Sequence, residues 1–226
     1  MTKNYGHIPH LLGSRLGQHD HYITEGQTRI ATVKARDCHD RIYVQEKLDG
    51  ANVGVWKIDD ELIPVTRSGN PCRKSTYLHH HYFSDWVFKH YDRFNNLLSE
   101  GERVAGEWLA LAHGTRYFPG RVLGWEPFVA FDIFTPANLR ITYENFYNRV
   151  QGIFKMPPIV SYRRPCSIEF AKAIYPKSLY GGEHVEGFIW RVERLGKVDF
   201  LCKWVDSAYS PGCLLDELIW NWKPHD

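Results

Sequence analysis

The sequence predicts an α+β fold in which the sheets are mainly antiparallel. Short aromatic and β-branched runs recur along the chain, separated by turns or by stretches that favour helix. Two such runs, ANVGVWKI (51–58) and ELIPVTRS (61–68), lie close enough together to form the arms of a hairpin. The segment YFSDWVFKHYDRFNNLLS (82–99) instead repeats its apolar residues at nearly the three-to-four spacing of a helix face. Both strands and helices are therefore expected.

The elements follow one another in a simple order. TEGQTRIATVKARD (24–37) opens on a threonine before a glutamate, which is typical of a helix start, and RIYVQEKL (41–48) predicts the first strand. The hairpin and the helix over 82–99 come next. The later predictions are the strands RVAGEWLAL (103–111), PFVAFDIF (127–134), VEGFIWRV (185–192) and VDFLCKWV (198–205), and the helix TYENFYNRVQGIF (142–154).

The composition is typical of a folded globular chain. The 226 residues are 43% hydrophobic and show no repeat, low-complexity tract or linker, so 1–226 is expected to form a single domain. A formal charge of +2 does not predict nucleic-acid binding by itself. No apolar run is long enough for a signal peptide or a bilayer span, which predicts a cytoplasmic protein without membrane contact. The five scattered cysteines, Cys213 among them, are expected to be reduced.

The stretch VQEKLDGANVGVWK (44–57) places Lys47 between two acidic residues and ahead of Gly50. Such a lysine is either an exposed side chain before a turn or a nucleophile. An amine becomes nucleophilic when burial or neighbouring cations lower its pKa, and the glycine lets backbone and ligand approach closely. The pattern Lys-x-Asp-Gly alone is too short to decide between the two.

The residues around Lys47 resemble motif I of the covalent nucleotidyltransferases, the superfamily of ATP-dependent DNA ligases, RNA ligases and mRNA-capping enzymes. The matching stretch is EKLDGAN (46–52), and the later motifs of the superfamily have counterparts in the same order, so the resemblance covers residues 44–205. These counterparts are TRSG (66–69) for motif Ia, AGEW (105–108) for motif III, FVAFDIF (128–134) for motif IIIa, VEGFIWR (185–191) for motif IV and FLCKWV (200–205) for motif V.

The resemblance implies a nucleotidyltransferase domain, in which antiparallel sheets flanked by helices form a cleft for ATP with Mg²⁺ or Mn²⁺. The implied catalytic residues are Lys47, which attacks the α-phosphate, and Lys203, which contacts that phosphate. The other implied nucleotide contacts are Glu46, Asn52, Arg67 (phosphate or ribose), Glu107 (ribose or metal shell), Phe131 (stacking on the base) and Glu186 (metal). Glu107 and Glu186 are the implied metal ligands.

Asn52 favours one branch of the superfamily. DNA ligases and capping enzymes usually carry arginine there, whereas Glu-Lys-x-x-Gly-x-Asn resembles the RNA ligases of the second, phage-type family. Only about twenty residues follow motif V, too few for an OB-fold or a sizeable C-terminal domain, and LLDELIWNWKPHD (214–226) supplies at most one short helix. We therefore expect an RNA ligase catalytic domain.

One position departs from the superfamily pattern. Motif V normally reads Lys-x-Lys, and Leu201 takes the place of the first lysine when Lys203 is aligned with the second. Either Lys197 or Arg191 reaches into the site as a substitute, or adenylylation is slow. This departure keeps open a degenerate module that binds nucleotides or RNA ends without turnover.

The resemblance thus implies an ATP-dependent RNA ligase that acts in RNA repair. It would form lysyl-AMP, transfer AMP to an RNA 5′ phosphate and seal to a 3′ hydroxyl. The alternatives within enzymes are a ligase of DNA or hybrid nicks and an enzyme that only adenylylates 5′ ends. The expected partners are RNA ends, in a nicked duplex, a cleaved tRNA or free strands, and a partner protein is compatible with a monomeric chain that lacks its own RNA-binding domain.

Two further segments have alternative interpretations. The run His79–His81 is expected in a solvated loop, with phosphate contacts, together with Arg73 and Lys74, as the alternative. Ser14 and Arg15, in a glycine-flanked loop, either bind an RNA 5′ phosphate or pack against a sheet.

Overall fold

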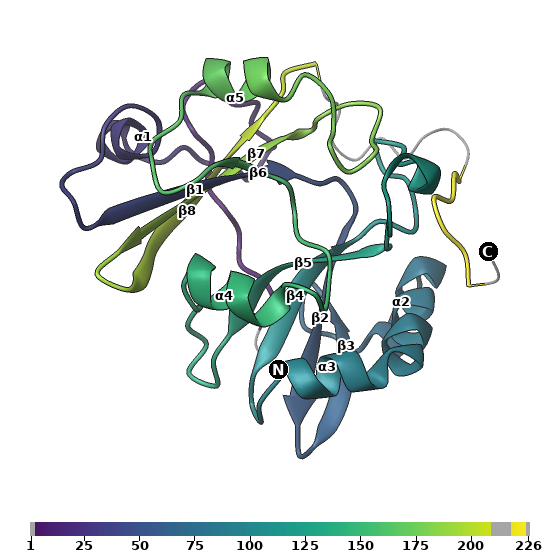
Figure 1. Ribbon diagram of the computed structural model, residues 1–226. Helices are drawn as coiled ribbons and strands as arrows, with labels where there is room; N and C mark the ends of the chain where they lie inside the picture. The colour runs from purple at the N-terminus through teal and green to yellow at the C-terminus, as the bar shows by residue number, and fades with distance from the viewer. Residues whose placement is uncertain (1–2, 209–217, 225–226) are drawn as a thin grey trace.

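Two four-stranded antiparallel sheets form the framework of the protein (Figure 1). The structure is a computed structural model that describes residues 3–208 and 218–224. The first sheet has the order β6-β1-β7-β8: Ile159–Ser161, Asp40–Lys47, Gly187–Arg194 and Lys197–Val205. The second has the order β3-β2-β4-β5: Glu61–Thr66, Ala51–Ile58, Arg103–Trp108 and Phe128–Phe134. The predicted α+β class and antiparallel pairing are confirmed.

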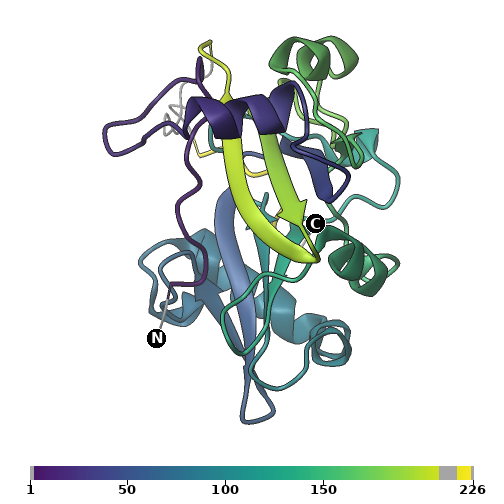
Figure 2. The same ribbon diagram turned by 90° about the vertical axis from the view of Figure 1, so that its left-hand side faces the viewer.

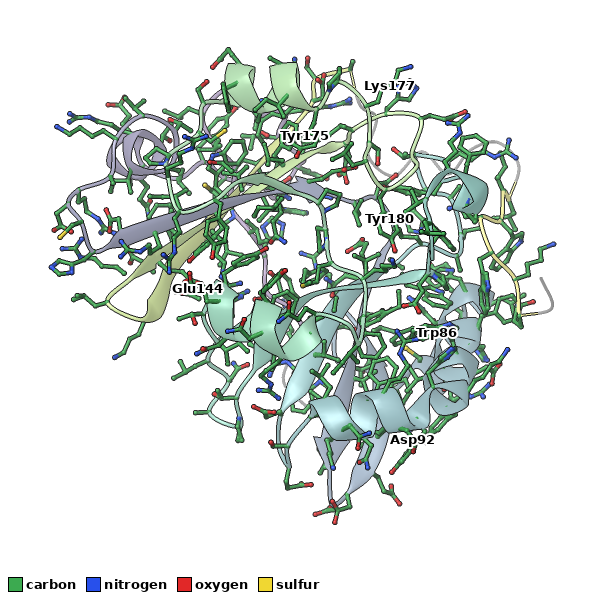
Figure 3. All side chains as sticks on the ribbon, viewed as in Figure 1. Trp86, Asp92, Glu144, Tyr175, Lys177 and Tyr180 are labelled. Atoms are coloured by element: carbon green, nitrogen blue, oxygen red, sulfur yellow. The ribbon has the colours of Figure 1, made fainter. Side chains whose placement is uncertain are left out.

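Different helices cover the two sheets. The first packs with α1 (Glu25–Thr32) and α5 (Ile168–Ile174), and Figure 2 shows α1 crossing β7 and β8. The second packs with α2 (Leu78–Lys89), α3 (Tyr91–Leu97) and α4 (Tyr143–Val150). Trp86 of α2 lies 5.7 Å from the ring of Phe128, in the core beneath this sheet (Figure 3). Short 3-10 turns lie at Cys72–Lys74 and Pro119–Arg121.

The helix α1 begins where the sequence predicts and ends earlier. Thr24 caps it through a capping box with Gln27. The prediction extended to residue 37, but Arg36 lies outside the helix because the Asp40 carboxylate accepts its backbone N–H at 2.7 Å and its guanidinium. A contact with the first sheet therefore replaces the last turn of the predicted helix.

The helix predicted over 82–99 is wrong in its limits and its continuity. It is two helices, which meet at His90, whose ring nitrogen lies 2.8 Å from the Trp86 carbonyl oxygen. The helix α2 starts at Leu78, so the histidine run is helical and not a solvated loop. His79 is only 8% exposed, and the next two histidines contact Ser75.

The remaining predictions differ in outcome. The hairpin of β2 and β3 is confirmed, with Asp59 and Asp60 at positive φ in its turn. The later strands and α4 are also present, whereas β6 and α5 were not predicted. Four described cysteines are free thiols. Cys213 and residues 214–217 and 225–226 lie outside the described residues, and the described part of the short helix considered over 214–226, residues 218–224, is not helical. No helix in the described part is long and apolar enough to cross a membrane.

Three features connect the sheets and fix the space between them. Residues 48–50 form the direct link from β1 in the first sheet to β2 in the second. Asp132 of β5 is 1% exposed and pairs with Arg191 of β7, while its second oxygen accepts from the Tyr5 hydroxyl at 2.7 Å. A third contact comes from α4, where Glu144 accepts from the Tyr43 hydroxyl of β1 at 3.3 Å (Figure 3).

Candidate active site

A pocket of about 270 Å³ lies between the two sheets and collects the residues that the sequence singled out. Both sheets contribute to its wall. Of the eight predicted site residues, the pocket is lined by Glu46, Lys47, Asn52, Arg67, Glu107, Phe131 and Lys203. The eighth, Glu186, reaches the pocket through its ion pair with Lys47.

Lys47 is the last residue of β1, and its side chain is 24% exposed. Strand β7 runs alongside, with Gly187 opposite Lys47, so that the preceding Glu186 pairs with the lysine Nζ. Burial alone would lower the pKa of Lys47, but Glu186 and Glu107 outweigh it and raise that pKa. The lowered pKa expected for a nucleophile is therefore not present in the protein without ligands.

Glu107 and Glu186 place a half-buried and a buried carboxylate beside one amine. Burial is the largest cause that raises the pKa of Glu107 to about 8 and that of Glu186 to about 7. Lys47 opposes both shifts, whereas repulsion from Glu186 and Asp49 adds to that of Glu107. Glu107 also accepts from the Gly50 backbone N–H at 3.2 Å. Two carboxylates with this excess of negative charge fit a divalent ion that takes its other ligands from water and phosphate.

The link between the sheets is held from both sides. A β-carbon on Gly50 would lie 2.6 Å from the Trp108 carbonyl oxygen, so only glycine fits there. The Asp49 carboxylate accepts from the backbone N–H groups of Gly114 and Thr115, each at 2.7 Å. The link therefore holds Lys47 and Asn52 at a fixed separation across the pocket.

Asn52, Phe131 and Glu46 line the pocket with groups that a nucleotide could meet. Asn52 lies opposite Glu107 in the β2–β4 pair, and its buried Oδ1 has no hydrogen-bond partner among the described residues. Phe131 is half-buried, with its ring 5.0 Å from that of Tyr5 in an edge-on contact. Glu46 accepts from the Leu179 N–H at 3.1 Å, and burial raises its pKa to about 7 against the lowering effect of hydrogen bonds from Ser178 and Leu179. An unpaired amide oxygen suits a ligand hydroxyl or amine.

Two cationic side chains lie at the edges of the pocket. Arg67, just beyond β3, is exposed and lines both this pocket and a second, larger cavity. Lys203 of β8 lies opposite Ile189, and burial lowers its pKa. Its Nζ lies 3.7 Å from Asp20, a residue that the sequence did not indicate because it is distant in the chain and belongs to no motif.

The N-terminal segment packs against β8. The backbone of Lys203 exchanges hydrogen bonds with Pro9 and Leu11, at 2.9 and 2.8 Å. The Ser14 hydroxyl accepts from the Val205 N–H at 2.9 Å and lies 2.7 Å from the His10 ring. Ser14 is therefore a packing residue, as one of the two alternatives stated.

Leu201 faces a cation that is already paired. It lines the pocket opposite Arg191 in the β7–β8 pair. That guanidinium also lines the pocket, but it donates to Asp132, to Glu193 and to the Ile141 carbonyl oxygen. Lys197 lies at the far end of β8, opposite Arg194, and does not line the pocket. The prediction that Lys197 replaces the missing motif V lysine is therefore wrong.

Comparisons with known proteins relate the chain to RNA ligases. A family model described as RNA ligase matches residues 40–205, and no curated protein matches the chain. Among solved structures, the Naegleria gruberi RNA ligase with pyrophosphate is 21% identical, at a TM-score of 0.52 over 75% of this chain and 50% of that one. A lysine-to-alanine variant of that ligase, with ATP and Mn, is 18% identical, with the same score over 75% and 51%. An archaeal ATP-dependent RNA ligase is 16% identical, at 0.52 over 90% and 48%.

These likenesses confirm the expected fold, that of RNA ligase structures. The chain spans about half the length of the solved proteins that it matches.

Proposed function

Because the chain belongs to the RNA ligase family, whose model matches residues 40–205, we propose that it is an ATP-dependent RNA ligase that acts through lysyl-AMP. One observation carries the proposal. Lys47 lies beside the carboxylates of Glu107 and Glu186 in a pocket that is also lined by Asn52, Phe131 and Lys203. A surface lysine without a catalytic role would not require these neighbouring side chains.

The first step is attack of the deprotonated Lys47 amine on the α-phosphorus of ATP. A bond forms between Nζ and phosphorus, the bond to the bridging oxygen breaks, and pyrophosphate leaves. Lys203 and Arg67 offset the charge on the phosphates, Phe131 stacks on the base, and the unpaired amide oxygen of Asn52 accepts from a ribose hydroxyl.

Two further steps complete the reaction. An RNA 5′ phosphate displaces Lys47 from phosphorus, which gives an RNA capped by AMP through a pyrophosphate bond. A 3′ hydroxyl then attacks the RNA 5′ phosphate, and AMP leaves as a phosphodiester forms. The positive charges of Lys203 and Arg67 assist both steps, because in each step negative charge accumulates on the phosphate under attack.

Glu107 and Glu186 are the residues proposed to hold Mg²⁺ or Mn²⁺. A divalent ion held by these residues would offset the negative charge of the carboxylates and of the phosphates. The Naegleria gruberi enzyme structure that carries ATP also carries Mn, which supports the choice of ion.

The covalent step is tested by incubating the chain with α-labelled ATP and Mn²⁺ or Mg²⁺. We expect label that survives denaturation in the wild type and in Lys34→Ala, since Lys34 is exposed and does not line the pocket. We expect none in Lys47→Ala. An unlabelled wild type, or label that persists in Lys47→Ala, contradicts the proposal.

The proposed substrate is RNA, and Asn52 supports this branch. Sealing is expected to favour a 3′-hydroxyl RNA terminus over an all-DNA nick when both carry the same 5′-phosphorylated donor. The measurement is the initial rate of phosphodiester formation on matched RNA, hybrid and DNA nicks. Equal rates on the three substrates would overturn the RNA preference, and label without sealing on any of them would leave a 5′-adenylylating enzyme.

A second candidate function is a module that binds nucleotides or RNA ends without turnover. It is favoured by Leu201, since the guanidinium of Arg191 opposite is already engaged by two carboxylates. The labelling experiment separates the two functions, because a module of this kind would bind ATP and never retain the label.

A further inference from the structure

A second cavity, of about 1140 Å³, opens beside the active-site pocket. We call it the α2 groove, after the helix whose first turn forms part of its wall. The residues that define it here are Lys74, Tyr77, His79, His80, His113 and Trp220. None of them takes part in the proposed adenylylation chemistry.

The α2 groove is continuous with the pocket. Tyr5, Asn52 and Arg67 line both cavities. His113 lies near enough to the nucleophile that Lys47 lowers its pKa and Asp49 raises it, although burial is the largest cause of its shift. A ligand in the groove would therefore reach the place where the nucleotide is attached.

The charges of the groove suit a polyanion. Lys3, Arg67 and Lys74 line it and are exposed, and none of the described residues in its wall is acidic. Burial lowers the pKa of His79 to about 3, so this ring is neutral and the positive charge comes from the lysines and the arginine. The uncapped first turn of α2 adds backbone N–H groups at the same wall.

The rings of the groove offer flat apolar surface. Tyr77 is 61% exposed, so most of its ring is accessible to a ligand. Its ring centroid lies 5.6 Å from that of His79, which in turn lies 6.0 Å from that of His113. This row of rings leads from the solvent side of the groove toward the nucleophile.

We propose that the α2 groove binds the unpaired nucleotides of a single-stranded RNA end, with bases on Tyr77 and phosphates on Lys74 and Arg67. Exposed aromatic faces suit bases that are not already stacked in a duplex, and the lack of carboxylates among the described residues of the wall favours the RNA backbone. The inference rests on the proposed function, since it supplies the strand whose end reacts at the pocket.

The test is the affinity of the whole chain for a fluorescent single-stranded RNA, measured by anisotropy without ATP. Tyr77→Ala is expected to weaken binding about tenfold or more, as for loss of one stacked base. Lys74→Ala is expected to reduce the slope of log affinity against log salt by about 0.7, the value for one phosphate contact on a single strand. Neither variant is expected to lose the lysyl-AMP label.

Matched controls use exposed residues elsewhere. Tyr147→Ala removes an exposed tyrosine of α4, and Lys34→Ala removes an exposed lysine beyond α1, so both should bind RNA as the wild type does. Wild-type affinity and salt slope in the Tyr77 and Lys74 variants would overturn the inference, as would a wild type that labels but binds no RNA. If the wild type forms no lysyl-AMP label while both variants weaken RNA binding, the proposed function is overturned and the inference about the α2 groove stands.

Two oligonucleotides distinguish which RNA end occupies the groove. One carries a 5′ phosphate and a blocked 3′ end, and the other has a 5′ hydroxyl and a free 3′ hydroxyl. Loss of affinity for either one in Tyr77→Ala supports the inference and assigns the donor or the acceptor strand. Unchanged affinity for both would overturn it.

Discussion

The Nζ atom of Lys203 lies 3.7 Å from a carboxylate oxygen of Asp20, close to the other end of the chain. Asp20 also lies 2.9 Å from the ring nitrogens of His7 and His10. His10 is 1% exposed, and its other ring nitrogen contacts Ser14. A buried imidazole with both nitrogens engaged fixes the N-terminal segment beside β8, and with it the surroundings of Lys203.

We expect Asp20→Ala to lower the free energy of unfolding by about 1 to 3 kcal/mol, because it leaves the buried His10 nitrogen without a partner. Asp20→Asn keeps an acceptor oxygen and should lose less than half as much. Urea denaturation of the three proteins provides the measurement. Equal stability of Asp20→Ala and the wild type would show that the carboxylate contributes nothing to this packing.

At the residue scale, the motifs identified the groups around the nucleotide but not the groups that hold them. Glu107 and Glu186 were found because each belongs to a short motif with a fixed neighbourhood. Asp20 and Asp132 were missed, since each acts through a partner that is far along the chain, and no local spacing marks such a pair. The sequence His-Asp-His at 19–21 suggests a polar cluster, but it does not indicate that Lys203 is the partner of Asp20.

At the scale of elements, long periodic or β-branched segments were predictable and short ones were not. Strand β6 has only three residues and exists because β1 offers an edge for pairing. The helix α5 carried a usable signal, since Ser167 caps it and Glu169 lies in its first turn. The break at His90 follows from a side chain that bonds back to α2, which apolar spacing cannot reveal.

The helix α2 gives the fold a measurable acid sensitivity. Burial lowers the pKa of His79 from 6.5 to about 3 in the folded protein, so the unfolded chain binds the proton more readily. Stability is therefore retained above pH 6.5 and lost as the pH falls below it. Between pH 7 and pH 5, the wild type should lose about 1 to 2 kcal/mol more than His79→Gln.

Chemical denaturation at the two pH values measures this difference. His19→Gln serves as the control, because His19 is exposed and its replacement should leave the wild-type difference unchanged. Parallel losses in His79→Gln and the wild type would contradict the assignment of the acid sensitivity to α2.

At the scale of the whole molecule, the pocket exists because contacts on two sides hold the sheets at a fixed distance from each other. The link at 48–50 sets one side of the space, and the pair of Asp132 with Arg191 closes the other. The pair is almost fully buried and is supplemented by Tyr5 and Arg140. The pair joins β5 of the second sheet to β7 of the first. Predicting each strand separately could not reveal this contact.

We expect Asp132→Ala to destabilise the protein by about 3 to 5 kcal/mol, because it leaves a buried guanidinium without one of its carboxylates. The matched control is Asp85→Ala, which breaks an exposed pair with Arg73 and should cost about 1 kcal/mol or less. Thermal and urea unfolding of both variants compare the two ion pairs. Similar losses would mean that the buried pair does not hold the sheets.

The origin of the pocket in two sheets has a consequence for enzyme engineering. In the proposed reaction, the reactive amine of Lys47 and its neighbours Glu186 and Lys203 lie in or directly before strands of the first sheet. The second sheet supplies Glu107 from β4 for the metal ion, and Asn52 from β2 and Phe131 from β5 for the sugar and the base. A preference for another nucleoside triphosphate can therefore be sought by libraries confined to β2 and β5. The reactive amine and its charged neighbours would stay as they are.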